Sequence, residues 1–564
     1  MSVAPSAARH SLDTFFSPSS IAIIGASRDP MKIPGLLLAF LRKNQFPGAI
    51  FPVNPNYPDI DGLPCYPSVA AISKPIDLAI VIIPAGAVLG ALEQCAAVGV
   101  KNAIIISSGF AEEGGDSTAM QDDIAALARR TGMRISGPNA EGYYNEAKRV
   151  AATFSPTVDV KPDAPRLLAT QRRIAIVAQS GGIGFAFYNR ARALGIALSY
   201  VISTGNESDL GVGEFLDYMV QDAATDVILL FVEGIRDTEK FLAAARRAAE
   251  IGKPVIVTKV GRSGAGERAA ASHTASMAGW SAAYDAVFAR YGFMVSNDLD
   301  EAITIAALLA TSPLPKGDRV AVVTVSGGAG IWGADTVSAQ GLQVPELSAS
   351  MQAAIRGLIP SYGSPRNPVD ITAQAVHSGG LQKTIDLLDR SDEVDAILVI
   401  ISMSSETRMP FKIAEQAADR GAEQVDCVLF LYDAVELRPN RAGGSRRRDS
   451  LGTDPCRCRD APIGAARKIP ADAACRRLAC LAGHFGMPGR SYAVRARQQG
   501  VAAPVRRVAA AGDSGDGQAG AGRCHRAHRV SARVENPVEG YSAQERSRRR
   551  SPRYRNRGCR TGGL

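Results

Sequence analysis

The sequence predicts an α/β protein with three doubly wound parallel-sheet domains, followed by an irregular basic tail. Short apolar runs alternate with helical stretches, and this alternation restarts twice after a proline-containing linker. The 564 residues are also too many for a single hydrophobic core. The chain divides by charge into two parts. The acidic body, residues 1–437, contains 36 Lys and Arg against 46 Asp and Glu, and the basic tail, residues 438–564, contains 28 Lys and Arg against 9 Asp and Glu.

The first domain is predicted over residues 12–150. Five apolar runs of strand length lie between residues 20 and 145, with helical segments between them. The runs, each with the turn that follows it, are SIAIIGAS, AIFPVNP, DLAIVIIP, NAIIISSGF and RISGPN. Parallel strands need crossover connections, so this order predicts one Rossmann-like sheet.

The same alternation predicts a second domain over residues 166–312 and a third over residues 316–437. The second contains the runs RIAIVAQSGGIG, LSYVISTGN, DVILLFVEGI and KPVIVTKVG. The third contains RVAVVTVSGGAGIW, VDAILVIIS and DCVLFLYD. Both are predicted to be flavodoxin-like, and we expect the third to be incomplete because the periodic pattern stops near residue 437.

The tail, residues 438–564, has no sustained apolar period and contains 27 Arg but one Lys. We interpret it as a product of translation out of frame, because GC-rich DNA shifted by a base yields Arg, Ala, Gly, Pro and Cys; sequencing the gene tests this. The alternative is a disordered arm that contacts nucleic-acid phosphates, without specific recognition. Its six cysteines lack zinc-site spacing, and we predict no metal site in the chain.

The amino-terminal residues lack the apolar core of a signal peptide. The longest apolar stretch, residues 78–92, is shorter than a membrane span and contains Pro84. Only Cys65, Cys95 and Cys427 fall in the acidic body, too few for a disulfide framework. We therefore expect a cytoplasmic protein that does not engage a membrane. We also expect it to form an oligomer.

Three glycine-rich turns follow predicted strands and precede helices, an arrangement that presents backbone N–H groups to phosphate. They are GASRDP around Gly25, QSGGIG at residues 179–184 and SGGAG at residues 326–330. The first is not GxGxxG, and PVNP ends the second strand where a ribose-binding acid would stand. A NAD-dependent oxidoreductase is therefore disfavoured, although it remains an alternative.

Five markers in order, SIAIIGAS, PVNP, VIIPA, SSGF and GPN, resemble the CoA-binding domain of the nucleoside-diphosphate-forming acyl-CoA synthetases and of the succinyl-CoA synthetase α chain. The resemblance implies that Asn139 lies near the thioester end of CoA. Many relatives have Cys after GPN, where this chain has Ala140 followed by Glu141. The residues that would line the CoA nucleotide are Gly25, Ser27, Lys32, Val53, Asn54, Pro55 and Pro84.

His273 lies in GRSGAGERAAASHTASMAG, a segment of small residues that follows a predicted strand end. Ligand sites concentrate at such positions, and imidazole is a competent nucleophile toward an acyl phosphate. SHTASMAG resembles the phosphohistidine loop of the same family, with Ala275 in place of a glycine. The resemblance makes His273 the phosphoryl carrier and Glu233, at the end of LLFVE, the carboxylate that holds its ring.

The family resemblance extends to the two later glycine-rich turns, which would clamp the phosphohistidine from the second and third domains. NPVDIT at residues 367–372 also matches the third domain, although a structural turn is an equal interpretation. The residues implied to bind phosphate are Ser180, Gly181, Gly182, Ser326, Gly327 and Gly328.

The resemblance implies an acid–thiol ligase that joins a small carboxylic acid to CoA through acyl phosphate and phosphohistidine. The chain has no segment similar to the ATP-grasp module, which handles ATP or ADP with Mg²⁺, and no P-loop. We expect that module to be supplied by a separate subunit or to have been lost. The remaining alternative is a catalytically silent CoA-binding or regulatory protein.

Overall fold

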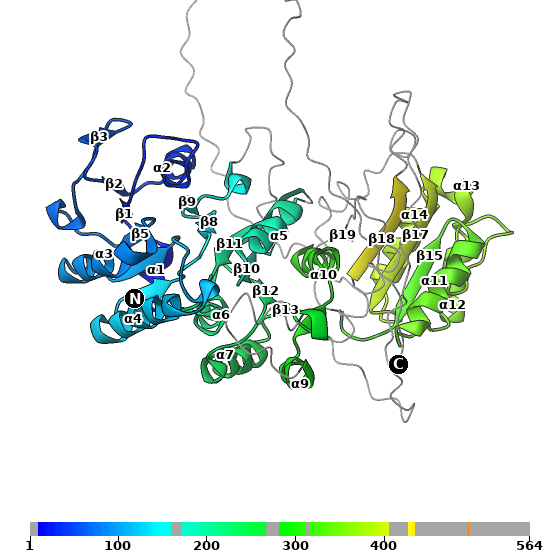
Figure 1. The fold of residues 1–564 in the computed structure, drawn as a ribbon. Helices are drawn as coiled ribbons and strands as arrows, with labels where there is room; N and C mark the ends of the chain where they lie inside the picture. The colour runs from blue at the N-terminus through cyan, green and yellow to red at the C-terminus, as the bar shows by residue number, and fades with distance from the viewer. Residues whose placement is uncertain are drawn as a thin grey trace, which may run out of the picture. The chain divides into compact units, whose positions relative to one another are not determined.

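The computed structural model describes residues 10–159, 172–193, 195–266, 281–311 and 315–404, together with strands at 427–434 and 494–495. His273 and nearly all of residues 438–564 lie outside the described residues. Figure 1 shows three large sheets with helices packed beside them. The mixed α/β architecture with parallel sheets confirms the predicted fold class.

The first sheet has five strands, and every neighbouring pair is parallel. Alternate residues of its first strand in the chain, β1 (Ser20–Ile24), belong to different hydrophobic clusters, with Ile21 and Ile23 on one face and Ala22 and Ile24 on the other. Helix α2 (Ile33–Lys43) covers the first face, while α3 (Ala85–Ala97) and α4 (Asp116–Thr131) cover the second. In spatial order the strands are β2 (Ala49–Val53), β1 (Ser20–Ile24), β5 (Leu78–Val81), β6 (Asn102–Ile105) and β7 (Arg134–Ser136).

The second sheet has seven strands, of which the last two come from the chain segment that directly follows the first sheet. Strand β8 pairs antiparallel with both β9 and β11. The predicted boundary at residue 150 thus falls inside the β8–β9 hairpin. In spatial order the strands are β14 (Met294–Ser296), β13 (Val255–Lys259), β12 (Val227–Val232), β10 (Ile174–Ala178), β11 (Leu198–Ser203), β8 (Gly142–Asn145) and β9 (Val150–Thr153).

The burial of β8 explains why this hairpin joins the second sheet. Tyr143 packs in one hydrophobic cluster and Tyr144 in another, so both faces of the strand are covered. The Tyr143 hydroxyl donates to the Phe15 carbonyl oxygen at 2.6 Å. The helices of this sheet are α5 (Gly181–Ala193), α6 (Val212–Gln221), α7 (Thr238–Ile251), α9 (Ser281–Arg290) and α10 (Leu299–Thr311).

The third sheet has the spatial order β16 (Val369–Asp370), β15 (Val320–Thr324), β17 (Ala396–Ser404), β18 (Cys427–Ala434) and β19 (Val494–Arg495). The first four strands are parallel, and β19, from the arginine-rich tail, pairs antiparallel with β18. The tail therefore contributes a two-residue strand that its irregular sequence did not predict. Helices α11 (Gly327–Ala339), α12 (Ala349–Arg356), α13 (Thr372–His377) and α14 (Gly380–Asp389) belong to this part of the chain.

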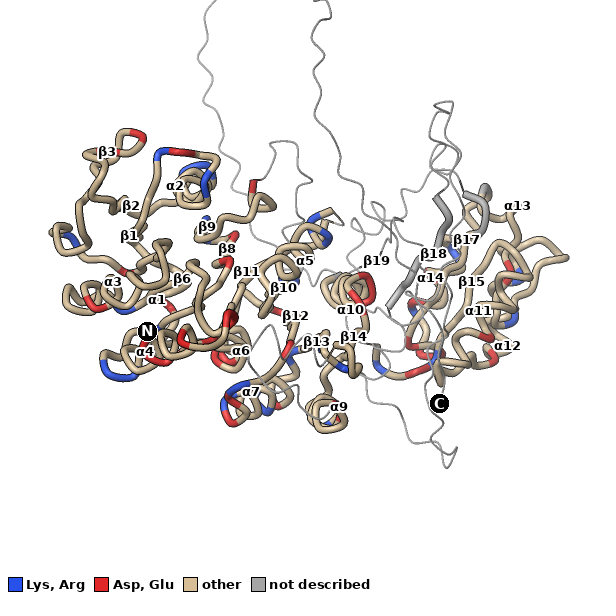
Figure 2. Tube along the Cα trace, viewed as in Figure 1, with Lys and Arg blue, Asp and Glu red and all other residues tan. Residues whose placement is uncertain are grey.

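Charged residues lie mainly on helices and loops, and the central strands are nearly free of them (Figure 2). Strands β1, β5, β10 and β12 contain no charged residue. Such uniformly apolar strands are typical of parallel sheets covered on both faces. Polar side chains that could bind a ligand are therefore expected at the ends of these strands and not on their faces.

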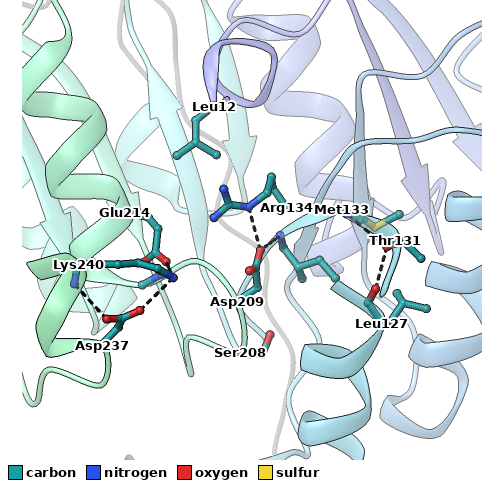
Figure 3. Close-up of polar contacts among 12 residues, drawn as sticks. Leu12, Leu127, Thr131, Met133, Arg134, Ser208, Asp209, Glu214, Asp237 and Lys240 are labelled. Atoms are coloured by element: carbon teal, nitrogen blue, oxygen red, sulfur yellow. Dashed lines mark hydrogen bonds and ion pairs between the residues drawn. The ribbon is translucent and has the colours of Figure 1, made fainter. Parts of the chain in front are cut away.

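A polar contact joins the first and second sheets near their strand ends. The Asp209 carboxylate accepts from Arg134 Nε at 3.2 Å and from the Ile135 backbone N–H at 2.9 Å, as Figure 3 shows. The Leu210 N–H donates to the Ile135 carbonyl oxygen at 2.9 Å. These contacts hold the loop after β11 against β7. Polar residues that follow strands of the first sheet therefore lie close to polar residues that follow strands of the second sheet.

Candidate active site

A pocket of about 460 Å³, larger than the pocket of about 380 Å³ at the predicted CoA nucleotide site, lies at the carboxyl ends of strands from the first and second sheets. The carboxyl ends of parallel strands are where α/β proteins bind ligands. Its apolar wall includes Ile82, Ile106 and Phe154. The polar wall follows five strands in turn: Ser107 and Ser108 after β6, Asn139 and Glu141 after β7, Gln179 to Gly182 after β10, Asn206 and Glu207 after β11, and Glu233 and Arg236 after β12.

The predicted phosphate turn of the second domain opens into this pocket. Ser180, Gly181 and Gly182 all line it, and Gly181 is the first residue of α5. A Cβ atom on Gly181 would lie 2.5 Å from both Cβ and Oε2 of Glu141, so no larger residue fits without a shift. The free N–H groups of a helix start favour anions.

Gln179 fixes the turn that presents Glu233, a role that the sequence motif did not reveal. Its Oε1 atom accepts from the backbone N–H groups of Glu233 at 2.5 Å and Gly234 at 3.0 Å. Its Nε2 atom donates to the Gly234 carbonyl oxygen at 2.7 Å and to Glu207 Oε1 at 2.9 Å. One side chain thus connects the ends of β10, β11 and β12 and holds the Glu233 backbone beside α5.

Glu207 is a buried carboxyl group that the sequence analysis did not single out. Its Oε1 accepts from Thr204 Oγ1 at 2.8 Å and the Val212 N–H at 3.2 Å, besides Gln179. Burial raises the pKa of Glu207 to about 7, against the lowering effect of its hydrogen bonds and of Arg236. Glu207 lies between β11 and α6 and has a backbone φ of 58°. No sequence motif marks this residue.

Glu207 and Arg236 also line a neighbouring hollow of about 500 Å³ at the starts of α6 and α7. Lys240 Nζ lies 2.5 Å from Glu214 Oε1 and 3.0 Å from Asp237 Oδ2 beside it, as Figure 3 shows. These ion pairs balance part of the acidic lining. Glu239 also lines the hollow, so its lining remains acidic.

Asn139, predicted to lie near the thioester, does line the larger pocket. Its backbone adopts φ 59°, and its N–H donates to the Ser107 carbonyl oxygen at 2.9 Å. Its side chain reaches Asn206 Oδ1 at 3.4 Å. Asn206 Nδ2 in turn donates to Gln121 Oε1 at 2.9 Å and to Glu112 Oε2 at 2.5 Å, a network that spans the two sheets and has no sequence signature.

The smaller pocket, of about 380 Å³, contains four of the residues predicted to hold the CoA nucleotide: Gly25, Val53, Asn54 and Pro55. Gly25 has φ +94°, and a Cβ there would lie 2.2 Å from the Ile82 carbonyl oxygen, so only glycine fits. Ile83 lines this pocket while its neighbour Ile82 lines the larger one. Two neighbouring residues at the end of β5 thus line different pockets, so the two pockets lie close together there.

Three domain families match successive parts of the chain. They are the CoA binding domain over residues 19–145, the succinyl-CoA ligase like flavodoxin domain over 171–309 and the ligase-CoA domain over 320–424. The α subunit of acetate–CoA ligase (ADP-forming) II of Pyrococcus furiosus is 35% identical, over 69% of this chain and 82% of that subunit. This chain belongs to the ADP-forming acyl-CoA synthetase family.

Two further relatives support the assignment to this family of acid–thiol ligases. Acetate–CoA ligase (ADP-forming) I of Archaeoglobus fulgidus is 34% identical over 73% of this chain, which spans 58% of that relative. The acetyl-coenzyme A synthetase 1 of Candidatus Korarchaeum cryptofilum, solved in complex with phosphate and ADP, superposes with a TM-score of 0.65. That structure is 34% identical and covers 70% of this chain and 82% of its own.

Three other residues predicted for CoA line neither pocket of this synthetase. The Ser27 hydroxyl accepts from the Asp29 N–H at 3.1 Å. Lys32 stands before α2 with its side chain 69% exposed and Nζ 3.9 Å from Asp29 Oδ2. Pro84 precedes α3. Their roles stay predictions.

The second predicted phosphate turn, Ser326, Gly327 and Gly328, lies at the start of α11 and does not line the larger pocket of the synthetase. A Cβ on Gly327 would lie 3.1 Å from Asp370 Oδ2. In the nearby NPVDIT segment, Asn367 bonds the backbone of Val320, Val322 and Pro345 at 2.9 to 3.0 Å. This part of the motif therefore has a structural role.

Among the residues that the structure describes, no group of His, Cys, Asp and Glu is arranged to hold a metal ion. Within the same residues, no helix has the length and apolar character needed to cross a membrane. His273 falls between the described segments that end at residue 266 and resume at 281. Its predicted approach to Glu233 therefore lies outside what the structure describes.

Proposed function

We propose that this chain joins a small carboxylic acid to CoA through an acyl phosphate, with His273 as the phosphoryl carrier. One observation carries the proposal: the α5 helix start, Glu233 and Asn139 line a single pocket. These are the groups expected for phosphate, for the histidine ring and for the thioester. Domains that match known ligase families surround that pocket.

CoA would extend from the smaller pocket into the larger one. The nucleotide would lie against Gly25, Asn54 and Pro55, where the glycine leaves the strand end open to a ligand. The Asn54 amide donates to the Ala26 carbonyl oxygen at 2.8 Å, so this side chain would shape the site through the backbone. The pantetheine arm would pass Ile83 and Ile82 toward Asn139.

Phosphoryl transfer would take place at the helix start of α5. The N–H groups there would stabilise the charge on the phosphoryl group of the acyl phosphate, whose P–O bond breaks to release the carboxylate. His273 would attack this phosphoryl group, and Glu233 would accept a hydrogen bond from the second ring nitrogen and so hold the correct tautomer. The Gln179 hydrogen bonds would keep Glu233 in place during the exchange.

The nucleotide step would need an ATP-grasp module from another polypeptide, which would bring ATP or ADP and Mg²⁺. The match over 82% of a relative named as an α subunit favours a partner subunit. Loss of the module through the event that created the tail is the competing explanation. We also propose a cytoplasmic, oligomeric enzyme.

The test is to incubate the purified chain with acetyl-CoA, or a panel of acyl-CoA thioesters, and ³²P-phosphate. We expect acid-labile, base-stable label on the wild-type chain and none on His273→Ala. A matched control, His377→Ala, removes another histidine of the acidic body and should label like the wild type. Label that survives in His273→Ala would remove the proposed carrier.

A catalytically silent CoA-binding protein is the second candidate, because this chain spans 58% of the Archaeoglobus fulgidus relative. It would bind CoA, measured by calorimetry, while no thioester of the panel gave label. The match to a CoA binding domain argues against the NAD-dependent alternative. A thermal shift with CoA but none with NAD is the expected result.

A further inference from the structure

Glu141 is the carboxyl group that stands nearest to the start of α5. Its Oε2 atom lies 2.5 Å from the position that a Cβ of Gly181 would take, so it faces the first turn of the helix. Its backbone N–H donates to the buried Ser203 hydroxyl at 3.0 Å. The residue is half-buried and lines the larger pocket together with Asn139.

The surroundings of Glu141 favour its neutral form. Burial raises the pKa of its carboxyl group, and a hydrogen bond from Ser155 offsets part of that effect. Among the described residues that line the pocket, the other ionisable groups are Glu207, Glu233 and Arg236. The elements packed against Glu141 contribute Ser155, Ser203 and Gly181, none of which is charged. A phosphate at α5 would disfavour the carboxylate further.

The other two carboxyl groups of the pocket have different surroundings. Glu207 Oε1 already accepts three hydrogen bonds, from Thr204, Gln179 and Val212. The Glu233 backbone is held by Gln179, and its side chain is the predicted partner of the histidine. Glu141 is therefore the carboxyl group left to exchange a proton with a ligand beside α5.

We propose that Glu141 carries the proton of the CoA thiol during the acyl transfer step. The inference rests on the proposed function and adds a residue to it. In the direction from acyl-CoA to acyl phosphate, a phosphate oxygen attacks the thioester carbonyl carbon and forms a C–O bond. The C–S bond breaks, its electron pair stays on sulfur, and Glu141 donates its proton to that sulfur. In the synthetic direction the Glu141 carboxylate takes the thiol proton as sulfur attacks the carbonyl carbon of the acyl phosphate, and the C–O bond breaks to release phosphate.

Two labelling reactions separate this role from a structural one. Acyl-CoA with ³²P-phosphate requires protonation of the leaving thiolate before His273 is labelled. Acetyl phosphate labelled with ³²P phosphorylates His273 directly and releases acetate, with no thiol proton involved. Glu141→Gln should therefore label about a hundredfold more slowly from acyl-CoA, but within about threefold of the wild type from acetyl phosphate.

The pH dependence is the second readout. The wild-type rate from acyl-CoA should fall as pH rises through the pKa of Glu141, because only the acid form donates the proton. Glu141→Gln should lack that limb, and Glu141→Asp should restore part of the rate together with the limb. Glu113→Gln, a carboxyl on the η2 turn (Ala111–Glu113) that lines neither pocket, is the control and should retain the wild-type profile.

The outcomes are distinct. An unchanged acyl-CoA rate and pH profile in Glu141→Gln would overturn the proton-carrier role, while label on the wild type would leave the proposed function standing. Equal loss in both reactions, with normal circular dichroism, would also overturn it and assign Glu141 to binding. A wild-type chain that no donor labels would refute the proposed function and this inference with it.

Discussion

Two helix starts in this chain share the sequence Ser-Gly-Gly but differ in what surrounds them. The start of α5 opens into a pocket with Glu141, Glu233 and Asn139. At the start of α11, Asp370 Oδ2 lies 3.1 Å from the position that a Cβ of Gly327 would take, and Ile331 and Trp332 in the next turn are 67% and 58% exposed. A glycine-rich turn therefore provides phosphate-binding potential, and the residues at the neighbouring strand ends decide whether a reaction can take place there.

The difference between the two helix starts can be tested by removing one carboxylate near each of them. Glu233→Gln should lower labelling of His273 from acyl-CoA about a hundredfold, because the histidine ring would lose the charged partner that we propose for it. Asp370→Asn in the third domain should change this half-reaction by less than about threefold. The rate of ³²P incorporation measures both. Equal losses would mean that α11 takes part in the acyl-CoA step as directly as α5 does.

The next largest expected effect is the contribution of Glu207 to the pH dependence of stability. Its folded pKa, about 7, lies above the ordinary 4.5, so the folded chain holds more protons than the unfolded chain between these values. The free energy of unfolding should therefore fall as pH rises from about 4.5 to about 7, by up to ~3 kcal/mol from this residue. Thermal melts across this range should be flatter for Glu207→Gln. Glu113→Gln should keep the wild-type slope.

A smaller effect distinguishes the glycines of the two turns. Gly181→Ala should destabilise the chain by about 2 kcal/mol, because the new Cβ meets Glu141 at 2.5 Å. Gly328→Ala has no heavy atom within 4 Å of the new Cβ and should be neutral or stabilising by up to about 1 kcal/mol. The midpoint of urea unfolding compares the two. A Gly181→Ala chain as stable as the wild type would show that Glu141 moves away freely.

The smallest effect concerns a third helix start, that of α2. If Lys32 contacts a CoA phosphate, Lys32→Ala should raise the dissociation constant for CoA about fivefold at low salt, and less at high salt. Its exposed side chain predicts a change in stability below about 0.5 kcal/mol. Calorimetry at two salt concentrations measures the affinity. Lys43→Ala, on the last turn of the same helix, is the control.

Local patterns predicted much of the fold. The five apolar runs of the first domain became β1, β2, β5, β6 and β7, because the strands of a parallel sheet covered on both faces are rich in apolar residues. Gly25 was identified for the same kind of reason, since a turn at φ +94° admits only glycine. Four residues of the predicted nucleotide site were found lining one pocket. They meet because β1 and β2 pair in parallel and end side by side.

Other features needed contacts between residues far apart in sequence. Gln179 bonds Glu233 and Glu207, and Asn206 bonds Gln121 and Glu112, yet none of these pairs has a characteristic spacing. The β8–β9 hairpin was missed because its residues follow the first sheet in sequence but pair with the second. Glu141 was noticed only as a departure from the family pattern. Its contact with Gly181 depends on the pairing of β8 with β11.

The α/β class, the glycine-rich turns and the family resemblance could be predicted from the amino-acid order, because each depends on short-range periodicity or on a local backbone requirement. The approach of Glu141 to Gly181 and the support of Glu233 by Gln179 exist only in the folded chain. Parallel strands distant in sequence end at one edge of a sheet. Side chains from five such ends therefore meet in one pocket that no local pattern describes.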